Sequence, residues 1–112
     1  MGIIKDRFRA KADSVAAEIK DLLKEHGNKV IGEVTLSQIY QGMRGITGLV
    51  TETSLLDAQE GIRFRGHSIP ELQAKLPKAP GGSEPLPEGL FYLMLIGELP
   101  SEEDAEHVTN IL

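Results

Sequence analysis

The chain has 112 residues, no cysteine, and a formal net charge of −5 from 12 Lys and Arg against 17 Asp and Glu. This length allows one modest core and excludes two ordinary domains. The lack of cysteine excludes a disulfide framework, a thiolate nucleophile and a zinc finger. The acidic balance argues against nucleic-acid or membrane partners. The longest apolar run, residues 90–96, is far shorter than the roughly 20 residues that span a bilayer, so the sequence predicts a soluble, folded protein.

The first part of the chain predicts one long helix followed by irregular structure. Apolar residues at steps of three and four predict an amphipathic helix over residues 4–26, which Gly27 and Asn28 should end. The β-branched stretch 29–36 predicts an extended segment before a brief helical turn at 37–41. Glycines crowd residues 42–48 and predict a loop whose backbone can turn sharply or approach another group closely.

The middle of the chain predicts a β-hairpin near residues 51–65. Its strands are expected at 51–56 and 62–65, around a type I turn with Gly61 in the left-handed position. Ser68 and Glu71 then have the spacing of a reciprocal helix cap, which predicts a helix that runs to about Leu76.

The last third predicts two further helices after a loop. Prolines and glycines over 77–87 predict a surface loop, and the apolar run that follows predicts a buried helix over 87–96. Ser101 should cap a final helix with an acidic first turn. Because no stop signal precedes Leu112, the sequence predicts a fragment of a longer protein. The overall expectation is a mainly α fold with one short hairpin.

Arg44 is the first candidate for a binding residue. A guanidinium on a glycine-rich loop can form a forked pair with a phosphate or a carboxylate. A surface or structural salt bridge is an equal alternative for this side chain. The glycines themselves match neither the dinucleotide-binding fingerprint nor a phosphate loop.

The histidines and two further arginines favour structural roles. His26, His67 and His107 have no paired spacing, so no metal site is predicted; His26 should interact with the helix dipole, and the other two should be exposed. Arg63 and Arg65 should share one face of a strand, with a glutamate across the hairpin, Glu52 or Glu60, as the partner.

The final helix begins with a cluster of carboxylates. The cluster consists of Glu102, Glu103, Asp104 and Glu106. Such a run is more typical of a solvated first turn than of a catalytic carboxylate pair. The pattern therefore favours a solvated turn at these four positions.

Several motifs in one order resemble the citrate synthase family, in its eukaryotic-type branch. They are residues 42–45, 48–54, 61–66, 68–71, 76–79, 81–82, 84–91 and 97–100. The resemblance covers the chain from His26 onward, and the first helix matches only in character. It implies a multi-helical, two-domain subunit in a homodimer. Residues 1–112 would be a single segment, the amino-terminal part of the large helical domain.

The resemblance also implies an activity for the complete enzyme. That family condenses acetyl-CoA with oxaloacetate and water to citrate and CoA in the citric acid cycle; acetyl-CoA is a co-substrate, and no cofactor is expected. The family's catalytic aspartate and histidines lie beyond Leu112, so the chain alone should be inactive. Arg44 matches an arginine that, in the family, helps to bind the CoA moiety. Arg63 and Arg65 match a motif of structural character, and both are expected to form ion pairs.

The sequence also carries expectations about cellular location and about an alternative function. Residues 1–7 lack a transit-peptide signature, which together with the family branch predicts a bacterial cytoplasmic protein; a processed mitochondrial protein is the alternative. A different functional hypothesis is a free-standing helical interaction module that binds a partner through uncovered apolar faces. Such a module should end its last helix with a stop signal.

Overall fold

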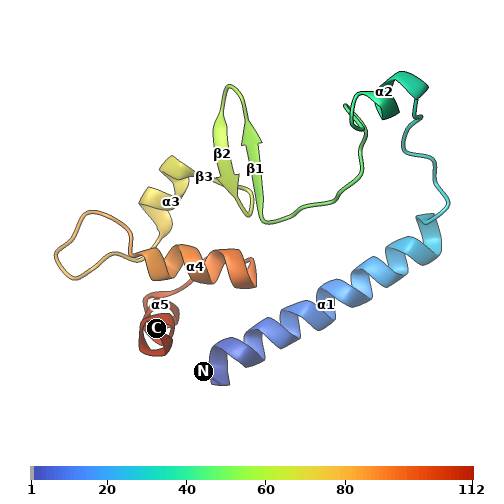
Figure 1. Cartoon of the computed structure of the whole chain (residues 1–112). Coiled ribbons are helices and arrows are strands. Elements are labelled where there is room, and N and C mark those ends of the chain that lie inside the picture. Colours follow the sequence, from blue (N-terminus) through green and yellow to red (C-terminus); the bar gives the residue numbers. More distant parts are fainter. Residues whose placement is uncertain (1) are drawn as a thin grey trace. The chain divides into compact units, whose positions relative to one another are not determined.

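The computed structural model describes Gly2–Leu112 and is mainly helical, with one small sheet (Figure 1). In chain order its elements are α1 (Gly2–His26), α2 (Leu36–Tyr40), β1 (Ser54–Asp57), β2 (Gly61–Phe64), β3 (His67–Ser68), α3 (Ile69–Lys75), α4 (Pro87–Ile96) and α5 (Glu102–Ile111). The predicted mainly α fold with a short hairpin is confirmed. None of the described helices has the length and apolar character needed to cross a membrane.

The chain divides into two compact units. The core unit comprises Gly2–Ser14 together with Thr51–Leu112, and the loop unit comprises Val15–Val50. The long helix α1 therefore begins in the core unit and ends in the loop unit.

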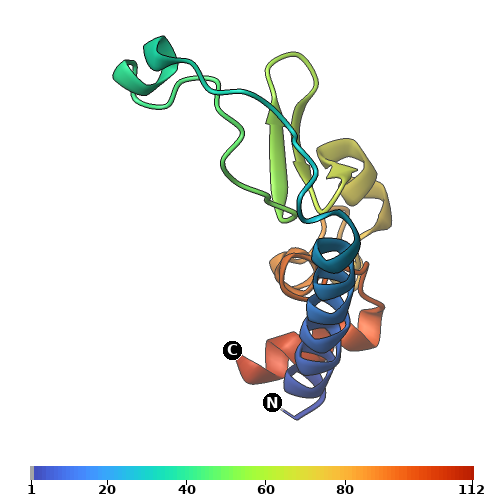
Figure 2. The same cartoon turned by 90° about the vertical axis from the view of Figure 1, so that its right-hand side faces the viewer.

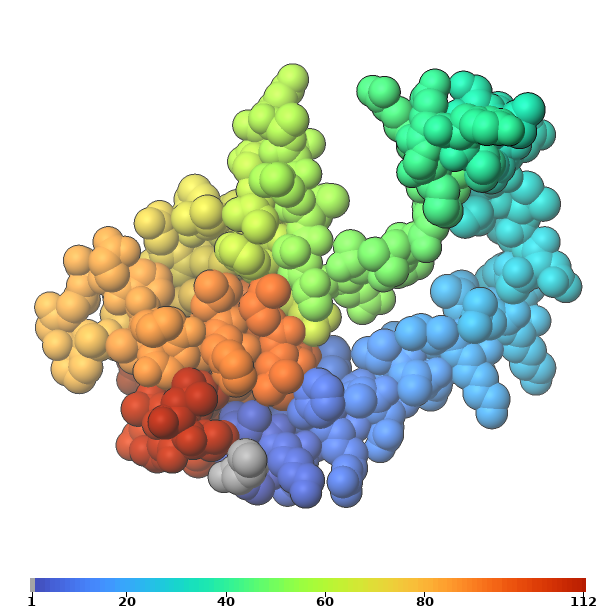
Figure 3. All heavy atoms as spheres, in the orientation of Figure 1, coloured from blue at the N-terminus to red at the C-terminus, as the bar shows by residue number. Residues whose placement is uncertain are grey.

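Helix α4 is the centre of the core unit. It is apolar on nearly all sides, which is the pattern of a buried helix. On one side Leu93 packs with Leu72 and Leu76 around α3. An adjoining side packs against the first turns of α1 and against α5, through Ile4, Tyr92, Ile96 and Val108. Figure 2 shows α5 beside the start of α1, and Figure 3 shows α4, in orange, between the yellow α3 and the red α5.

The hairpin is shorter than predicted at its start and is joined by a third strand. The strands β1 and β2 are antiparallel, with Ser54 opposite Phe64. The predicted extension of the first strand to residue 51 is wrong, because its partner strand ends at Phe64 and the next residue, Arg65, adopts a left-handed φ of 49°. The chain then turns back, and β3 pairs with the end of β2. This third strand, only two residues long, was not predicted.

The turn of the hairpin is held by one carboxylate. Asp57 accepts hydrogen bonds from the backbone N–H groups of Gln59 and Glu60, both at 2.8 Å. The N–H groups of Glu60 and Gln59 stabilise the ionised carboxylate and hold the pKa of Asp57 below its usual value. Gly61 closes the turn with a φ of 95°, as predicted for the left-handed position.

The helix caps confirm one sequence expectation and correct another. Ser68 caps α3 by accepting a hydrogen bond from the Glu71 N–H at 3.4 Å, but the predicted return bond from Glu71 to the Ser68 N–H is not formed. Helix α5 has the full reciprocal cap, between Ser101 and Asp104. The predicted loop 77–87 contains one isolated β-bridge, which joins its two ends at residues 78 and 85.

Candidate functional site

A turn over residues 41–45 directly follows α2 in the loop unit, and because it contains Arg44 we call it the Arg44 turn. Three of its residues have left-handed backbone conformations: Gly42 with a φ of 74°, Met43 with 62° and Gly45 with 73°. The Arg44 N–H donates to the Gln38 carbonyl oxygen at 3.3 Å, so the turn folds back on the helix before it. A left-handed methionine costs about 1–3 kcal/mol, and strain of this kind is often found at functional sites. The predicted glycine loop is thus confirmed as a specific, tight turn.

A reciprocal cap between Thr35 and Gln38 holds the start of α2, the helix that precedes this turn. Thr35 accepts a hydrogen bond from the Gln38 N–H at 3.2 Å, and the Gln38 side chain accepts one from the Thr35 N–H at 2.9 Å. Gln38 therefore fixes the start of α2 with its side chain and the Arg44 turn with its carbonyl. Sequence reasoning missed this pair, although the Thr-x-x-Gln spacing is the signal that identifies a capping box.

The Arg44 side chain is exposed. Among the described residues, none forms a hydrogen bond or an ion pair with its guanidinium, so the surface salt bridge offered as the alternative is not made within this part of the chain. Five N–H donors in a planar fork suit a phosphate or a carboxylate. The Arg44 guanidinium can therefore bind an anionic group of a ligand or of another part of a larger protein.

Arg63 has the partner expected for it. Its guanidinium forms an ion pair with Glu60, donates to the Gly66 carbonyl oxygen at 2.8 Å, and lies 3.6 Å from a Glu71 oxygen. The hydrogen bond with Glu60 is the main reason that the pKa of Arg63 is raised. Of the two predicted partners, Glu60 is confirmed and Glu52 is not.

The predicted face and partner of Arg65 are wrong. Its left-handed backbone ends the strand alternation, so Arg65 does not share a face and a glutamate with Arg63. Its guanidinium instead donates two hydrogen bonds, at 2.9 and 3.2 Å, to the Met94 carbonyl oxygen in the last turn of α4. This places a cation at the negative end of the helix dipole. Arg65 therefore ties the hairpin to the central helix.

The three histidines lie in different elements of the chain. His26 is exposed in the last turn of α1, as predicted. His67 and His107 were expected to be exposed but are partly buried. Each lies near a glutamate four residues away: His67 Nδ1 is 3.4 Å from Glu71, and His107 Nε2 is 3.6 Å from Glu103. No cluster of three or more possible metal ligands occurs in the described residues.

Glu71 lies beside Arg63 and His67. Burial acts to raise the pKa of its carboxyl, but the neighbouring His67 and Ser68 side chains and the charge of Arg63 outweigh burial, and the net pKa lies below its usual value. These contacts explain why the Glu71 side chain does not complete the predicted cap of α3.

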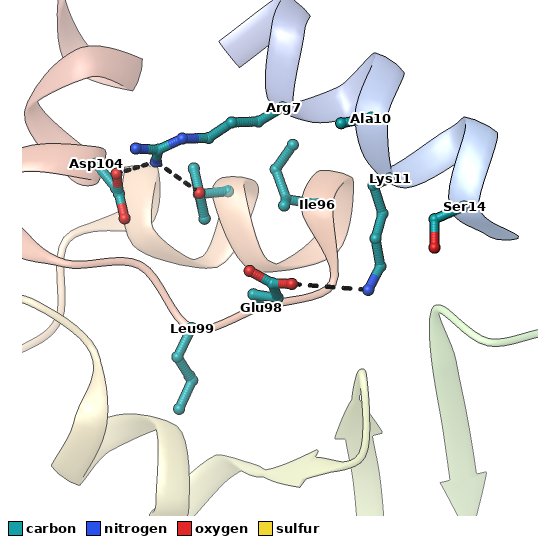
Figure 4. A pocket seen from close by; sticks show the side chains of 9 residues that line it. Arg7, Ala10, Lys11, Ser14, Ile96, Glu98, Leu99 and Asp104 are labelled. Carbon is teal, nitrogen blue, oxygen red and sulfur yellow. Dashed lines mark hydrogen bonds and ion pairs between the residues drawn. The ribbon is translucent and has the colours of Figure 1, made fainter. Parts of the chain in front are cut away.

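A polar pocket of about 540 Å³ lies in the core unit (Figure 4). Arg7 of α1 reaches Asp104 of α5 in an ion pair and donates a hydrogen bond to the Tyr92 hydroxyl at 2.8 Å. Lys11 lies 3.8 Å from Glu98 on the other side of the pocket. The four charged side chains thus form two ion pairs. These contacts join α1 to α4, to α5 and to the segment between them, so none of the four charges is left to bind a ligand.

Asp104 corrects the prediction for the acidic cluster. Glu102, Glu103 and Glu106 are exposed, as expected for a solvated turn, but the Asp104 side chain is only 14% exposed. Its burial acts to raise the pKa of the carboxyl, but hydrogen bonds from the Ser101 backbone and from Arg7 outweigh burial, and the net pKa is lowered. A contact between residues 7 and 104 has no sequence signal.

Comparison with known proteins reveals strong similarity to one enzyme family. No protein-family model matches the chain. The mitochondrial citrate synthase of Aspergillus niger is 57% identical over 106 residues, which is 95% of this chain and 22% of that protein. The mitochondrial citrate synthase of Saccharomyces cerevisiae is 60% identical, and the mitochondrial 2-methylcitrate synthase of Yarrowia lipolytica is 61% identical, each over 99 residues, 88% of this chain and 21% of the relative.

These relatives correct the predicted location and show which enzyme the chain resembles. The expectation of a bacterial cytoplasmic protein is wrong, since the similar enzymes are eukaryotic and mitochondrial by name. That expectation relied on residues 1–7, and a transit peptide is a removable segment whose absence from a stretch of sequence does not define the compartment of the folded part. The chain spans about a fifth of the length of these relatives. It is therefore homologous to part of a citrate synthase of the eukaryotic mitochondrial type.

Proposed function

We propose that this chain is the amino-terminal part of a citrate synthase of the mitochondrial matrix, an acyltransferase that condenses acetyl-CoA with oxaloacetate and water to citrate and CoA. Identity of 57% over 95% of the chain supports this proposal. In it, residues 1–112 form a single segment of the large helical domain of a homodimeric enzyme, and other parts of the polypeptide supply the catalytic residues. No cofactor is required.

The contribution of this chain to the reaction is to hold the CoA moiety through Arg44. The observation that carries this role is the exposed guanidinium on a strained turn that Gln38 holds in place. A forked bond to a phosphate or pyrophosphate oxygen contributes about 1.5–3 kcal/mol, whereas an exposed salt bridge contributes about 0–1 kcal/mol. The two roles for this arginine therefore differ by a measurable amount.

The Arg44 role is tested in the complete enzyme that contains this segment. Arg44→Ala is expected to raise the KM for acetyl-CoA about tenfold or more and to leave the KM for oxaloacetate nearly unchanged. Arg44→Lys should restore little, because an ammonium group cannot make the forked contact. Steady-state kinetics with each substrate varied in turn measures both constants.

Arg9→Ala is the matched control, because Arg9 is an exposed arginine of α1 in the core unit. This variant should leave both constants unchanged. A lower melting temperature for Arg44→Ala with both KM values intact would assign Arg44 a structural role and remove it from the CoA site.

The isolated chain should have no citrate synthase activity. Release of free CoA from acetyl-CoA and oxaloacetate, followed with a thiol reagent, measures this directly. Turnover that requires both substrates and is absent from a mock preparation would show that residues 1–112 contain the catalytic groups after all.

A further inference from the structure

Gln38 contacts the Arg44 turn through both its backbone and its side chain. The backbone carbonyl oxygen accepts the hydrogen bond from the Arg44 N–H at 3.3 Å. The side-chain nitrogen Nε2 lies 3.6 Å from the position that a Cβ would take on Gly45, where φ is 73°. One residue of α2 therefore contacts two consecutive residues of the turn.

The same side chain is also bonded to the start of α2. Its oxygen Oε1 accepts a hydrogen bond from the Thr35 N–H at 2.9 Å, and the Thr35 hydroxyl accepts one from the Gln38 N–H at 3.2 Å. The amide of Gln38 thus has its oxygen on the cap and its nitrogen beside the turn. Within residues 16–50, only Gln38 and Ile46 are partly buried, and all the others are exposed. Gln38 is therefore the polar side chain around which this stretch is organised.

Bonds of this kind matter because little else stabilises α2 and its turn within the loop unit. Helix α2 has five residues, and isolated helices shorter than about 12 residues are marginal in water. None of the described residues of the loop unit buries a hydrophobic side chain that could compensate. The left-handed Met43 adds strain, which persists only where the surrounding structure holds it. The bonds of Gln38 oppose both tendencies.

We infer that Gln38 is a positioning residue, which holds the Arg44 turn in the conformation that presents the guanidinium to the ligand. This inference rests on the proposed function of Arg44 and concerns a residue that acts through it. When only a fraction of the molecules has the binding conformation, the apparent dissociation constant rises by the inverse of that fraction. Loss of the Gln38 side-chain bonds lowers that fraction, so acetyl-CoA binds more weakly while the steps after binding are unchanged.

Gln38→Leu in the complete enzyme that contains this segment tests the role. The change keeps the backbone carbonyl and a side chain of similar size, but it removes the acceptor for the Thr35 N–H. The KM for acetyl-CoA should rise about three- to fivefold, the shift that loss of one helix cap produces. Both kcat and the KM for oxaloacetate should stay within about 1.5-fold of their original values. Gln59→Leu, at an exposed glutamine of the hairpin in the core unit, is the matched control and should change none of the three.

Two substitutions of Thr35 separate the cap from the size of residue 38. Thr35→Ala removes the hydroxyl that accepts from the Gln38 N–H and should reproduce the effect of Gln38→Leu. Thr35→Ser keeps that hydroxyl and should retain the original constants. A lower kcat, or an equal rise of both KM values, in Gln38→Leu and Thr35→Ala would assign the cap a general structural role and overturn the inference.

A double-mutant cycle with Arg44→Ala decides whether the effect passes through Arg44. In the Arg44→Ala background, Gln38→Leu should change the KM for acetyl-CoA by less than about 1.5-fold, because the guanidinium that it positions is absent. If Gln38→Leu does not fold, Thr35→Ala completes the same cycle. An undiminished effect in the Arg44→Ala background would overturn the positioning role.

The single variants distinguish this inference from the proposed function. Original constants for Gln38→Leu, beside a loss of about tenfold for Arg44→Ala, would overturn the positioning role and leave the role of Arg44 intact. An unchanged KM for acetyl-CoA in Arg44→Ala itself would instead overturn the proposed function on which the inference rests.

Discussion

Both units of this chain contain large apolar side chains, but only the core unit buries them. Among the described residues, the core unit buries eight hydrophobic side chains, including Leu93 with no exposed surface, and the loop unit buries none. The loop unit is nevertheless rich in large apolar side chains, and Val30, Ile31 and Leu49 are each 78–81% exposed. Hydrophobic content alone therefore does not produce a core; the apolar side chains must also converge on one another.

The local structure of the loop unit comes from short-range signals instead. Its helix α2 begins at the Thr35 cap, and the Arg44 turn depends on left-handed residues and on one bond to Gln38. Extensive apolar exposure marks a surface that packs against more protein. In the proposed enzyme, other parts of the polypeptide cover this surface. Matched substitutions in the two units test the contrast between a unit held by burial and a unit held by local bonds.

The largest expected effect is on the buried leucine of the core unit. Leu93→Ala should destabilise the chain by about 2–5 kcal/mol, because it removes a fully buried side chain and leaves a cavity. Leu23→Ala is the matched change in the loop unit, where the side chain is 62% exposed, and should change stability by less than about 0.5 kcal/mol. Urea unfolding followed by circular dichroism gives both values.

Amide hydrogen exchange adds the location of each effect. Leu93→Ala should remove protection from α4 and leave the second half of α1 unchanged. Equal destabilisation by the two leucine substitutions in the isolated chain would mean that the loop unit has a core of its own, and the contrast between the units would be lost.

A smaller effect is expected at the glycine that ends α4. Gly97 has a φ of 89°, so Gly97→Ala should cost about 1–2 kcal/mol of backbone strain. The nearest atoms to an added Cβ, in Arg65 and Lys11, lie 3.6 Å away, which leaves strain as the only cost. Gly48→Ala, with no atom within 4 Å of its Cβ, is the control in the loop unit and should be nearly neutral. Thermal melts of both variants check the difference.

The smallest effect concerns the ionisation of Asp104. Its folded pKa is lowered from 3.8, so the ionised carboxylate stabilises the core unit above that pH, and this stabilisation is lost as pH falls through the folded pKa. Asp104→Asn should therefore remove part of the loss of stability at acid pH. Glu106→Gln, which changes an exposed carboxyl on the same helix, should not. Unfolding curves between pH 7 and pH 2 measure both slopes, and parallel slopes for wild type and Asp104→Asn would contradict the assignment.

The elements that the sequence predicted correctly depend on neighbours within a few residues. The periodicity of residues 4–26, the Ser101 cap and the glycine after Ile96 each determine one helix or one helix end, and the structure has those helices. The glycine turn around Arg44 belongs to the same class, since positive φ angles are a property of single residues. The family was recognisable for a related reason, because its motifs are short stretches of consecutive residues.

Contacts between distant parts of the chain could not be predicted in this way. The ion pair of Arg7 with Asp104 joins residues 97 positions apart, and the bonds from Arg65 to Met94 depend on a strand that ends at Phe64. Ile4 and Leu23 both belong to α1, yet Ile4 is buried against α4 and Leu23 is exposed. This difference depends on which side chains pack against each residue. The sequence by itself therefore determined where the main helices lie and where the glycine turns occur. Only the tertiary structure decided which apolar faces and charges found partners, because burial and ion pairing depend on distances between groups that chain order leaves open.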